Sequence, residues 1–353
     1  MSNVFENKGA MAATVVVAAS DSLNKAAANF VCSGANDEVE IQAAIDALPA
    51  GGGDIKLLEG TYHIAAVITV PDYTVIKGCH IPTWGMGTIL ELDYDGTMFE
   101  LLGTNRLTDR VQGCGLYNLL IDGNSRAGRR AIDAKYCHNF TITDCTFYQC
   151  IPAIYAEECW DWALYNVNFN YCGDVTNPQV TAYNGADDNC NWWKFINCRW
   201  EPMTGIGFFS DNTGDGSDNH QFSFSHCKFH GVLGEDPSQG LSAMSGCLKG
   251  CRIFGNTFFY GEGTANAIGM LDGSNVIIVC NHFSDYADYA IELEGGDHMI
   301  EANRFINSGV AAFVHHIDAG GTSILTGNVA RTPADLIDNA HGTDVEANNI
   351  ELV

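Results

Sequence analysis

A short pattern of alternating apolar and polar residues recurs along most of this chain and ends each time at an apolar residue, in most copies an aromatic one. One clear copy is Phe140–Phe147, Phe-Thr-Ile-Thr-Asp-Cys-Thr-Phe. Ten copies close at positions 121, 147, 169, 200, 229, 258, 283, 305, 330 and 350, at intervals of 20 to 31 residues. A period with variable loops is typical of a solenoid. Alternation with a period of two predicts that each copy is a β-strand.

The position two residues before the closing residue also repeats. It is occupied in most copies by a thiol or an amide, namely Cys145, Cys198, Cys227, Asn256, Asn281, Asn303, Asn328 and Asn348. In coils stacked about 4.8 Å apart, Asn side chains can form a ladder and thiols can pack as small apolar groups. The pattern resembles the right-handed parallel β-helix of the pectate-lyase-like superfamily, including its Asn ladder, over roughly residues 30–350. The resemblance implies an all-β solenoid of about 10–12 coils.

The start of the chain predicts a lid on the first coil. Residues 1–30 form an opening segment whose apolar run, Thr14–Ala18, predicts a strand. Residues 36–48 predict an amphipathic helix, capped by Asn36, with an apolar stripe of Val39, Ile41, Ala44, Ile45 and Leu48. A helix in this place would cover the open end of a β-helix. The helix, the glycines 51–53 and Gly60-Thr-Tyr resemble the opening of pectate-lyase-like proteins, which include phage tailspikes and polysaccharide-degrading enzymes. We expect a single domain, with coils over residues 55–350.

Composition excludes several classes of function. The net charge is -26, and nucleic-acid binding needs a basic footprint, so no nucleic-acid partner is expected. The first ten residues show no secretory signal, and the apolar runs are too short to span a membrane. This fits a viral particle, or cytoplasmic synthesis without Sec export. The 14 cysteines include no Cys-x-x-Cys pair, and we expect most of them to be reduced and buried.

Each copy is followed, after a loop, by a second short apolar segment. We assign these segments to the first sheet of the β-helix, which together with its bordering loops forms the saccharide groove in pectate-lyase-like proteins. They are 132–136, 154–158, 180–183, 206–210, 241–244, 268–271, 291–294, 313–316 and 336–339.

Strand alternation predicts which side chains of this sheet face outward. Asp133 and Lys135 would project from one coil, and Tyr155 and Glu157 from the next. Asp133 and Glu157 would lie diagonally, roughly 7–8 Å apart. That separation suits an acid/base pair of carboxylates.

Basic residues gather just before this strand. Arg126, Arg129, Arg130 and Lys135 are four of the chain's 17 Lys and Arg residues. Such a group suits a uronate carboxylate, and β-elimination needs that carboxylate neutralised while a Lys, Arg or Tyr removes the C5 proton. The alternative is that these bases only balance nearby acids on the surface.

Further candidates come from neighbouring coils. Tyr183 and Asp211 would extend the substrate-binding face, and Trp160, Trp162, Trp192 and Trp193 stand at nearby turns, where an exposed ring can hold a sugar. We expect two of the four Trp rings to be exposed. The alternative is inward packing.

A second outward cluster comprises Glu292 and Glu294 with His315 and His316 nearby. It could be a hydrolase pair or a Ca²⁺ site, and loop 211–220 could also hold Ca²⁺. The alternative is a solvated acidic face. No other cofactor is expected.

No catalytic set of the family carries over to this sequence residue by residue. We therefore expect a protein that binds, and cleaves, an extended and acidic polysaccharide, with β-elimination favoured. The alternatives are a glycoside hydrolase or tailspike depolymerase, and a non-catalytic polysaccharide-binding or viral structural protein. A homotrimer, as occurs in tailspikes, is the oligomer that the resemblance allows.

Overall fold

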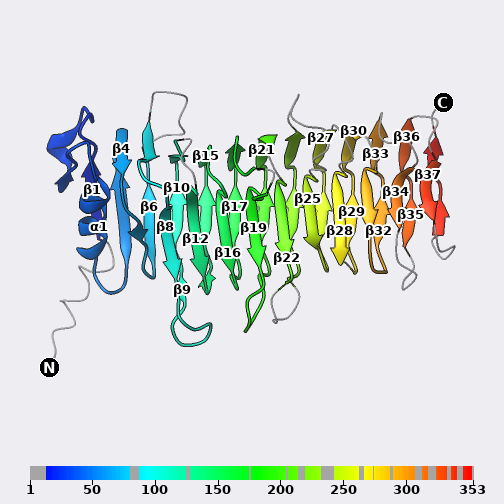
Figure 1. Ribbon diagram of the computed structural model, residues 1–353, viewed down its shortest axis with the longest axis horizontal. Helices are drawn as coiled ribbons and strands as arrows, with labels where there is room; N and C mark the ends of the chain where they lie inside the picture. The colour runs from blue at the N-terminus through cyan, green and yellow to red at the C-terminus, as the bar shows by residue number, and fades with distance from the viewer. Residues whose placement is uncertain are drawn as a thin grey trace. The chain divides into compact units, whose positions relative to one another are not determined.

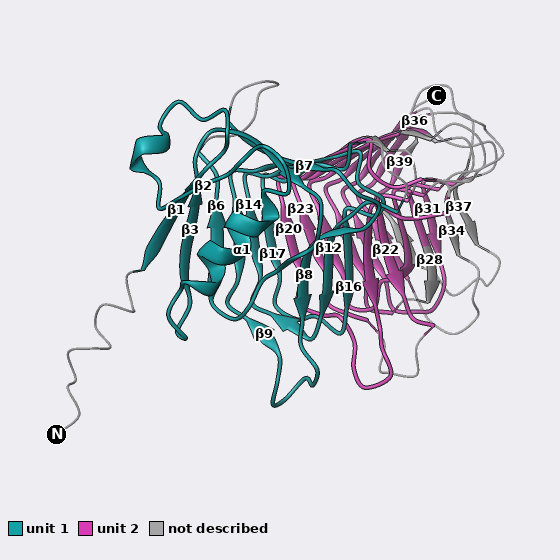
Figure 2. Ribbon diagram, turned by 60° about the vertical axis from the view of Figure 1, so that its left-hand side comes forward, with its two compact units in different colours: residues 1–168 teal, residues 169–353 magenta. Residues whose placement is uncertain are grey.

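The chain divides into two compact units, residues 1–168 and 169–353 (Figure 2). The structure, a computed structural model, describes residues 13–79, 87–124, 128–174, 176–203, 206–213, 219–231, 242–261, 266–272, 274–286, 289–306, 312–316, 323–331, 335–339 and 345–351. Within this part of the chain, no helix is long and apolar enough to cross a membrane.

In most coils the chain passes through a strand of sheet A, a two-residue turn, a strand of sheet B and, after a loop, a strand of sheet C (Figure 1). Sheet A of the first unit comprises, in spatial order, β2 (Phe30–Val31), β1 (Thr14–Ala18), β3 (Gly53–Leu57), β6 (Thr74–Lys77), β10 (Gly115–Tyr117), β14 (Thr141–Thr143) and β17 (Ala163–Tyr165). Its sheet B comprises β4 (Gly60–Ile64), β7 (Thr88–Leu92), β11 (Leu120–Asp122) and β15 (Thr146–Tyr148). Its sheet C comprises β5 (Ile68–Thr69), β8 (Thr97–Leu102), β12 (Arg130–Lys135) and β16 (Ile154–Glu157). A small pair, β9 (Val111–Gln112) and β13 (Cys137–His138), and the turn η2 (Lys25–Ala27) complete this unit.

The second unit repeats the arrangement, and β18 (Asn168–Asn170) contains the boundary. Its sheet A comprises β20 (Lys194–Ile196), β23 (Ser223–Ser225), β26 (Arg252–Phe254), β29 (Ile277–Val279), β32 (Met299–Glu301), β35 (Ile324–Thr326) and β38 (Val345–Ala347). Its sheet B comprises β21 (Arg199–Met203), β24 (Lys228–Gly231), β27 (Thr257–Gly261), β30 (His282–Tyr286), β33 (Arg304–Ile306), β36 (Val329–Arg331) and β39 (Ile350–Glu351). Its sheet C comprises β19 (Val180–Tyr183), β22 (Phe208–Asp211), β25 (Met244–Cys247), β28 (Ile268–Asp272), β31 (Ile291–Leu293), β34 (Ala312–His316) and β37 (Asp335–Asn339).

These parallel sheets confirm the predicted fold, a right-handed parallel β-helix. Neighbouring strands pair in parallel and bring equivalent residues of successive coils into register, as Ile142 does with Leu116 and Leu164. The inward residues of the strands are buried, and in each unit they form the core. The expected single domain stays a prediction.

The turn from sheet A to sheet B has the same conformation in coil after coil. Its first residue has a φ between +54° and +65° in Asn118, Asp144, Asn166, Asn197, His226, Gly255, Cys280, Ala302, Gly327 and Asn348. Gly, Asn and Asp adopt this left-handed conformation at the least cost, which explains why they occupy most of these positions. The second residue of the turn points inward and forms the repeated thiol and amide column.

The predicted Asn ladder is present in the second unit. The backbone N–H of Asn256 donates to Asn281 Oδ1 at 2.8 Å, and that of Asn281 donates to Asn303 Oδ1 at 2.9 Å. The column continues through Asn328 to Asn349 at 3.0 Å. The prediction was wrong for Asn348, because Val329 pairs with Ile350 and the final coil is therefore shifted by one residue. Asn348 takes the left-handed turn position instead.

Beside the ladder, the closing aromatic residues of the second unit form a continuous stack. Ring centroids are 4.3 to 5.0 Å apart along Phe169, Trp200, Phe229, Phe258, Phe283 and Phe305. Each of these rings is fully buried. Removing a ring of this kind typically costs about 3–5 kcal/mol, so the stack is a major part of the core.

The predicted helix over the first coil is α1 (Glu38–Asp46), and two details of its prediction were wrong. Asn36 does not cap it and instead has a φ of +55°. Val39 is 59% exposed, whereas Glu38 is buried and accepts a hydrogen bond from the Ala65 N–H at 2.9 Å. Asp37 accepts from the N–H groups of Gly34 and His63. Carboxylates that accept backbone hydrogen bonds therefore hold the first turn of the helix against the coil.

All 14 cysteines are free thiols, and all but Cys79 and Cys280 are buried, as expected. Several thiols donate to the carbonyl oxygen two residues earlier, as Cys145 does to Thr143 at 3.4 Å and Cys198 to Ile196 at 3.6 Å. The thiols thus contribute packing and weak hydrogen bonds to the interior.

Replacing a ladder amide should destabilise the second unit more than replacing a thiol in the same column. Asn281→Ala removes the acceptor for Asn256 and the donor to the Ile253 carbonyl, and should lower the free energy of unfolding by about 2–4 kcal/mol. Cys198→Ala is the matched control, with an expected loss of about 1 kcal/mol. Urea denaturation of both variants measures the difference, and equal losses would contradict the ladder's role.

The left-handed turns predict a stabilising substitution. Ala302 is exposed with a φ of +54°, so Ala302→Gly should raise the free energy of unfolding by about 0.5–1 kcal/mol. Gly327 has a φ of +65° and no atom within 4 Å of an added Cβ, so Gly327→Ala should lower it by about 1 kcal/mol through the backbone alone. Thermal unfolding of the two variants measures both changes in stability, and stabilisation by Gly327→Ala would refute the argument.

Candidate functional site

Sheet C of the first unit carries two adjacent outward rows of polar side chains. Asp133 is in register with Tyr155, and Lys135 with Glu157, as predicted. On the other side, β12 pairs with β8, which places Glu100 beside Asp133. All five side chains are half-buried. The strands therefore gather acids, a base and a phenol on one face.

The charged groups of this face are held in pairs. Arg130 Nη1 forms an ion pair with Asp133 Oδ2, and the Arg130 guanidinium lies 4.4 Å from the centroid of the Tyr155 ring. Lys135 Nζ lies 2.6 Å from Glu157 Oε1. Partly exposed ion pairs of this kind contribute about 0–1 kcal/mol each, so an anionic ligand can replace the protein carboxylate as the partner of either cation.

The other two arginines of the predicted group are not part of these rows. Arg129 donates from Nε to the carbonyl oxygen of Gln149. It also lies near Asp122, where burial raises the pKa of the carboxyl and the Arg129 charge opposes that rise. Arg126 lies outside the described residues.

Sequence reasoning missed Glu100. The inward residues of β8 include Phe99 and Leu101, so the same alternation rule predicts that Glu100 faces outward. The signal was present in the sequence, but residues 70–102 show no clear copy of the repeat. Glu100 and Asp133 stand on neighbouring parallel strands, about 4.8 Å apart at Cα. The site thus contains two adjacent carboxylates in addition to the predicted diagonal pair.

Sheet C of the second unit carries its own outward row. The predicted neighbours Tyr183 and Asp211 are in register, and Asp211 Oδ1 accepts the N–H of Thr213 at 2.9 Å. Thr181, two residues before Tyr183 on β19, is only 6% exposed. Phe209 is half-buried and follows Thr181 in the same row.

Small residues separate Phe209 from an acid in this row. Phe209 is in register with Ser245, Ser245 with Gly269, and Gly269 with Glu292. Glu292 Oε2 accepts a hydrogen bond from Asn266 Nδ2 at 2.6 Å. An aromatic ring and an oriented carboxylate on either side of two small residues suit the ring of a sugar.

The structure brings part of the predicted second cluster together. Glu292 is in register with His315, and Leu293 with His316. Glu294 follows β31 and is half-buried. The side chains of His315 and His316 lie outside the described part of the chain.

The tryptophans divide between surface and core. Trp192 is 54% exposed, and Trp160 is half-buried with its ring stacked on His138 at 4.6 Å. The prediction was wrong for Trp162, which is fully buried because its Nε1 donates to the Cys137 carbonyl oxygen at 2.9 Å. Trp193 is fully buried as well. Trp192 therefore has the ring most available to a ligand.

Among the described residues, His63, Glu91 and Asp93 of the first unit have ligand atoms within 4.8 Å of one another, as a divalent cation would need. His63 Nδ1 lies 3.0 Å from Asp93 Oδ2. The Asn124 amide donates to Glu91 Oε1 at 3.0 Å and to Asp93 Oδ1 at 3.4 Å. The carboxylates thus have neutral partners within the protein. Residues 214–218 of the loop considered for Ca²⁺ lie outside the described residues.

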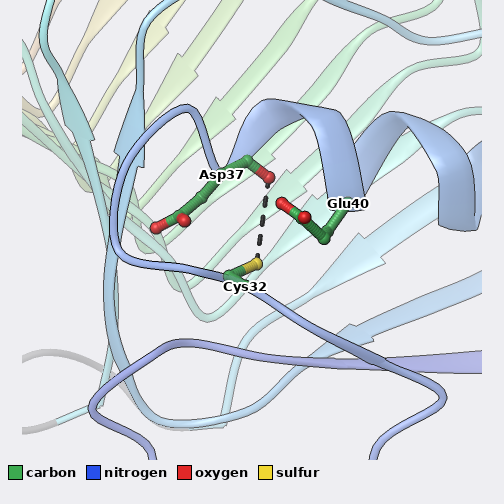
Figure 3. Close-up of side chains that lie close together, drawn as sticks. All are labelled: Cys32, Asp37 and Glu40. Atoms are coloured by element: carbon green, nitrogen blue, oxygen red, sulfur yellow. Dashed lines mark hydrogen bonds between the residues drawn. The ribbon is translucent and has the colours of Figure 1, made fainter.

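Cys32, Asp37 and Glu40 also lie close together, beside the first turn of α1 (Figure 3). The Cys32 thiol donates to the Asp37 carbonyl oxygen at 3.8 Å. Burial, with the charges of Asp37 and Glu40, raises the pKa of Cys32 well above its ordinary value. Because both carboxylate oxygens of Asp37 already accept backbone hydrogen bonds, we interpret this cluster as part of the helix contact.

No family model matches the sequence, and a comparison with curated proteins finds no match either. Solved structures do match, and all three described here are parallel β-helix proteins. ORF18 of Geobacillus virus E2 is 20% identical with a TM-score of 0.65, over 90% of this chain and 59% of that one, so the chain spans well under two thirds of the viral protein. The surface adhesin PfbA of Streptococcus pneumoniae is 15% identical with a TM-score of 0.64, over 90% and 88%. The A-module of the Azotobacter vinelandii mannuronan C-5 epimerase AlgE4 is 16% identical with a TM-score of 0.61, over 90% and 91%. At these identities the likeness establishes the fold.

Substitution of a buried tryptophan and of an exposed one should affect stability very differently. Trp162→Ala should lower the free energy of unfolding by about 3–5 kcal/mol, whereas Trp192→Ala should change it by less than about 0.5 kcal/mol. If Trp192 holds a sugar, its substitution should weaken polysaccharide binding about tenfold or more in the folded protein. Denaturation and affinity electrophoresis in polysaccharide gels measure the two effects. Unchanged mobility of Trp192→Ala would remove this residue from the binding site.

Proposed function

We propose that the protein binds an extended, acidic polysaccharide along sheet C of the first unit and cleaves it by β-elimination. The observation that carries the proposal is the clustering of Arg130, Tyr155 and Lys135 on one sheet face, where Arg130 lies over the Tyr155 ring and Lys135 is in register with Glu157. Arg130 and Lys135 supply positive charge on the surface of a chain with a net charge of -26. Concentrating cations in such a chain favours an anionic ligand.

The chemistry of β-elimination assigns a role to each of the three. Arg130 neutralises the uronate carboxylate, which makes the proton on C5 more acidic. Tyr155, as the phenolate under the Arg130 guanidinium, takes the C5 proton onto its oxygen, and the C5–H electron pair forms the double bond between C4 and C5 as the bond from C4 to its oxygen breaks. Lys135 gives a proton to the departing oxygen. Asp133 and Glu157 orient the two cations before the substrate binds.

The similar structures are compatible with this substrate class. The name of one of them, mannuronan C-5 epimerase, indicates action on a uronate polymer. Epimerisation at C5 and β-elimination both begin with removal of the C5 proton. The adhesin among them supports the rival proposal, a protein that binds without cleaving.

A second candidate is hydrolysis of a neutral polysaccharide on sheet C of the second unit. The strands of this sheet contain no Lys or Arg in their described positions, and their described outward side chains include the acids Asp211 and Glu292. Such a face would repel a polyanion, whereas Phe209 and Glu292 suit a neutral sugar and an acid catalyst.

Incubation of the full chain with polygalacturonate and with alginate tests the proposal. Absorbance of the unsaturated uronate product should appear with the wild type, and Tyr155→Phe and Arg130→Gln should each reduce its rate by about a hundredfold or more. Lys77→Ala is the matched control, because Lys77 pairs with Asp54 at 2.7 Å on sheet A of the same unit with an exposure similar to that of Lys135. Its rate should stay within about twofold of the wild type.

Other outcomes decide against β-elimination. Release of reducing ends without the absorbance would favour hydrolysis, and its loss in Glu292→Gln would place it on the second unit. Binding of the polymers without any product would favour the non-catalytic protein. Full activity of the Tyr155 and Arg130 variants would refute the assigned site.

A further inference from the structure

Basic residues are unevenly distributed among the sheets of the second unit. Residues 169–353 contain seven bases, Lys194, Arg199, Lys228, Lys249, Arg252, Arg304 and Arg331. Four of the seven lie in strands of sheet B, namely β21, β24, β33 and β36, and sheet B also contains His230 and His282. Against these, the strands β21 to β36 of sheet B contain two carboxylates, Glu201 and Asp285. The six strands β21 to β36 of sheet B are therefore basic in a chain that is strongly acidic.

Most of these bases stand at outward positions that follow the strand register and form a straight row. Arg199 pairs with Lys228, Lys228 with Thr257, Thr257 with His282, and His282 with Arg304. From Lys228 to Arg304 the row crosses three strand spacings, about 14 Å. Alternate residues of a strand face the same side, so these side chains all face outward from the core. We call this row, with Arg331, the basic ridge.

One end of the basic ridge is held by a single acid. Glu201 accepts from Lys228 Nζ at 2.9 Å and from His230 Nδ1 at 3.0 Å, and it forms an ion pair with Arg199. Burial alone would raise the pKa of Glu201, but its contacts with Lys228, Arg199 and His230 lower that pKa to about 2. Two full positive charges and one negative charge therefore remain at this end at neutral pH.

The other end carries two exposed arginines. Arg304 and Arg331 are both exposed, and neither has an ion-pair partner within the described part of the chain. Burial and the charge of Arg304 both lower the pKa of His282, so the positive charge at neutral pH comes from the arginines. The ring of Phe259 lies in the neighbouring row, 5.4 Å from that of His230. Exposed guanidinium groups are suited to bind the carboxylate and sulfate groups of anionic sugars.

We propose that the basic ridge on sheet B of the second unit is a binding site for a linear, polyanionic polysaccharide, separate from the face of sheet C. Parallel strands place two groups of cations, Arg199 with Lys228 and Arg304 with Arg331, along one outward face, which suits a linear polymer with repeated negative groups. The four bases form a smaller basic footprint than nucleic-acid binding needs. A second copy of the chain would bring a further 26 negative charges in excess, and it is the less favoured occupant. The proposal does not depend on cleavage at sheet C.

Binding of a labelled heparin oligosaccharide to the full chain, measured by fluorescence anisotropy at low and moderate salt, tests this site. The double variant Arg304→Glu, Arg331→Glu should weaken binding at least tenfold, and the wild-type affinity should fall as salt increases. Arg252→Glu is the matched control, because Arg252 is an equally exposed base on sheet A of the same unit, and it should change affinity less than twofold. The double variant Arg304→Ala, Arg331→Ala provides a second test in case the Glu variant misfolds. It should weaken heparin binding by a smaller factor.

Three results would overturn the proposal. The first is no binding of heparin by the wild type in low salt. The second is an equal loss in Arg252→Glu, which would mean that only net charge matters. The third is concentration-dependent self-association in sedimentation, removed by the ridge variants, without heparin binding, which would identify the occupant as a second copy. Heparin binding that depends on Arg304 and Arg331 in a protein that forms no unsaturated product would mean that the site on sheet C fails while the ridge stands.

Discussion

The structure depends on parallel hydrogen bonding between equivalent residues of successive coils. A single coil has too few apolar residues to make a core of its own, and it buries them only against the next coil. Because side chains alternate across a strand, a slip of one residue between coils would turn every inward side chain outward. The left-handed residue at most turns between sheets A and B, followed in most coils by an inward thiol or amide, fixes that register. In the second unit the Asn ladder and the aromatic stack then repeat without interruption from Asn256 and Phe258 onward.

This dependence explains how much of the fold could be predicted. The repeat, its strand character and the Asn column follow from spacing alone, because each coil must present the same residue types at the same place. The prediction failed by one residue at Asn348, where the final coil has no closing aromatic to mark its register. It also failed at the start of α1, where helical periodicity cannot show that Glu38 is buried to accept a backbone hydrogen bond while Val39 is exposed.

The sequence predicts which residues of β12 and β16 form the candidate site, but it does not predict which of them contact one another. Alternation placed Asp133, Lys135, Tyr155 and Glu157 on one face, and the register confirms their neighbours. Which cation pairs with which acid depends on side-chain reach across coils, and spacing gives no information about it. Trp162 shows the same limit, since an indole beside a turn is buried here by a hydrogen bond to a carbonyl of the preceding coil. The separation of charge between sheets B and C emerges only once each strand has been assigned to its sheet.

The most direct test of the account is a crystal structure of the full chain with a uronate oligosaccharide bound. The account predicts that the sugar chain lies across β12 and β16 of sheet C, with a uronate carboxylate against Arg130 and its C5 facing Tyr155. An oligosaccharide bound elsewhere, with the ion pairs of Arg130 and Lys135 unchanged, would contradict it.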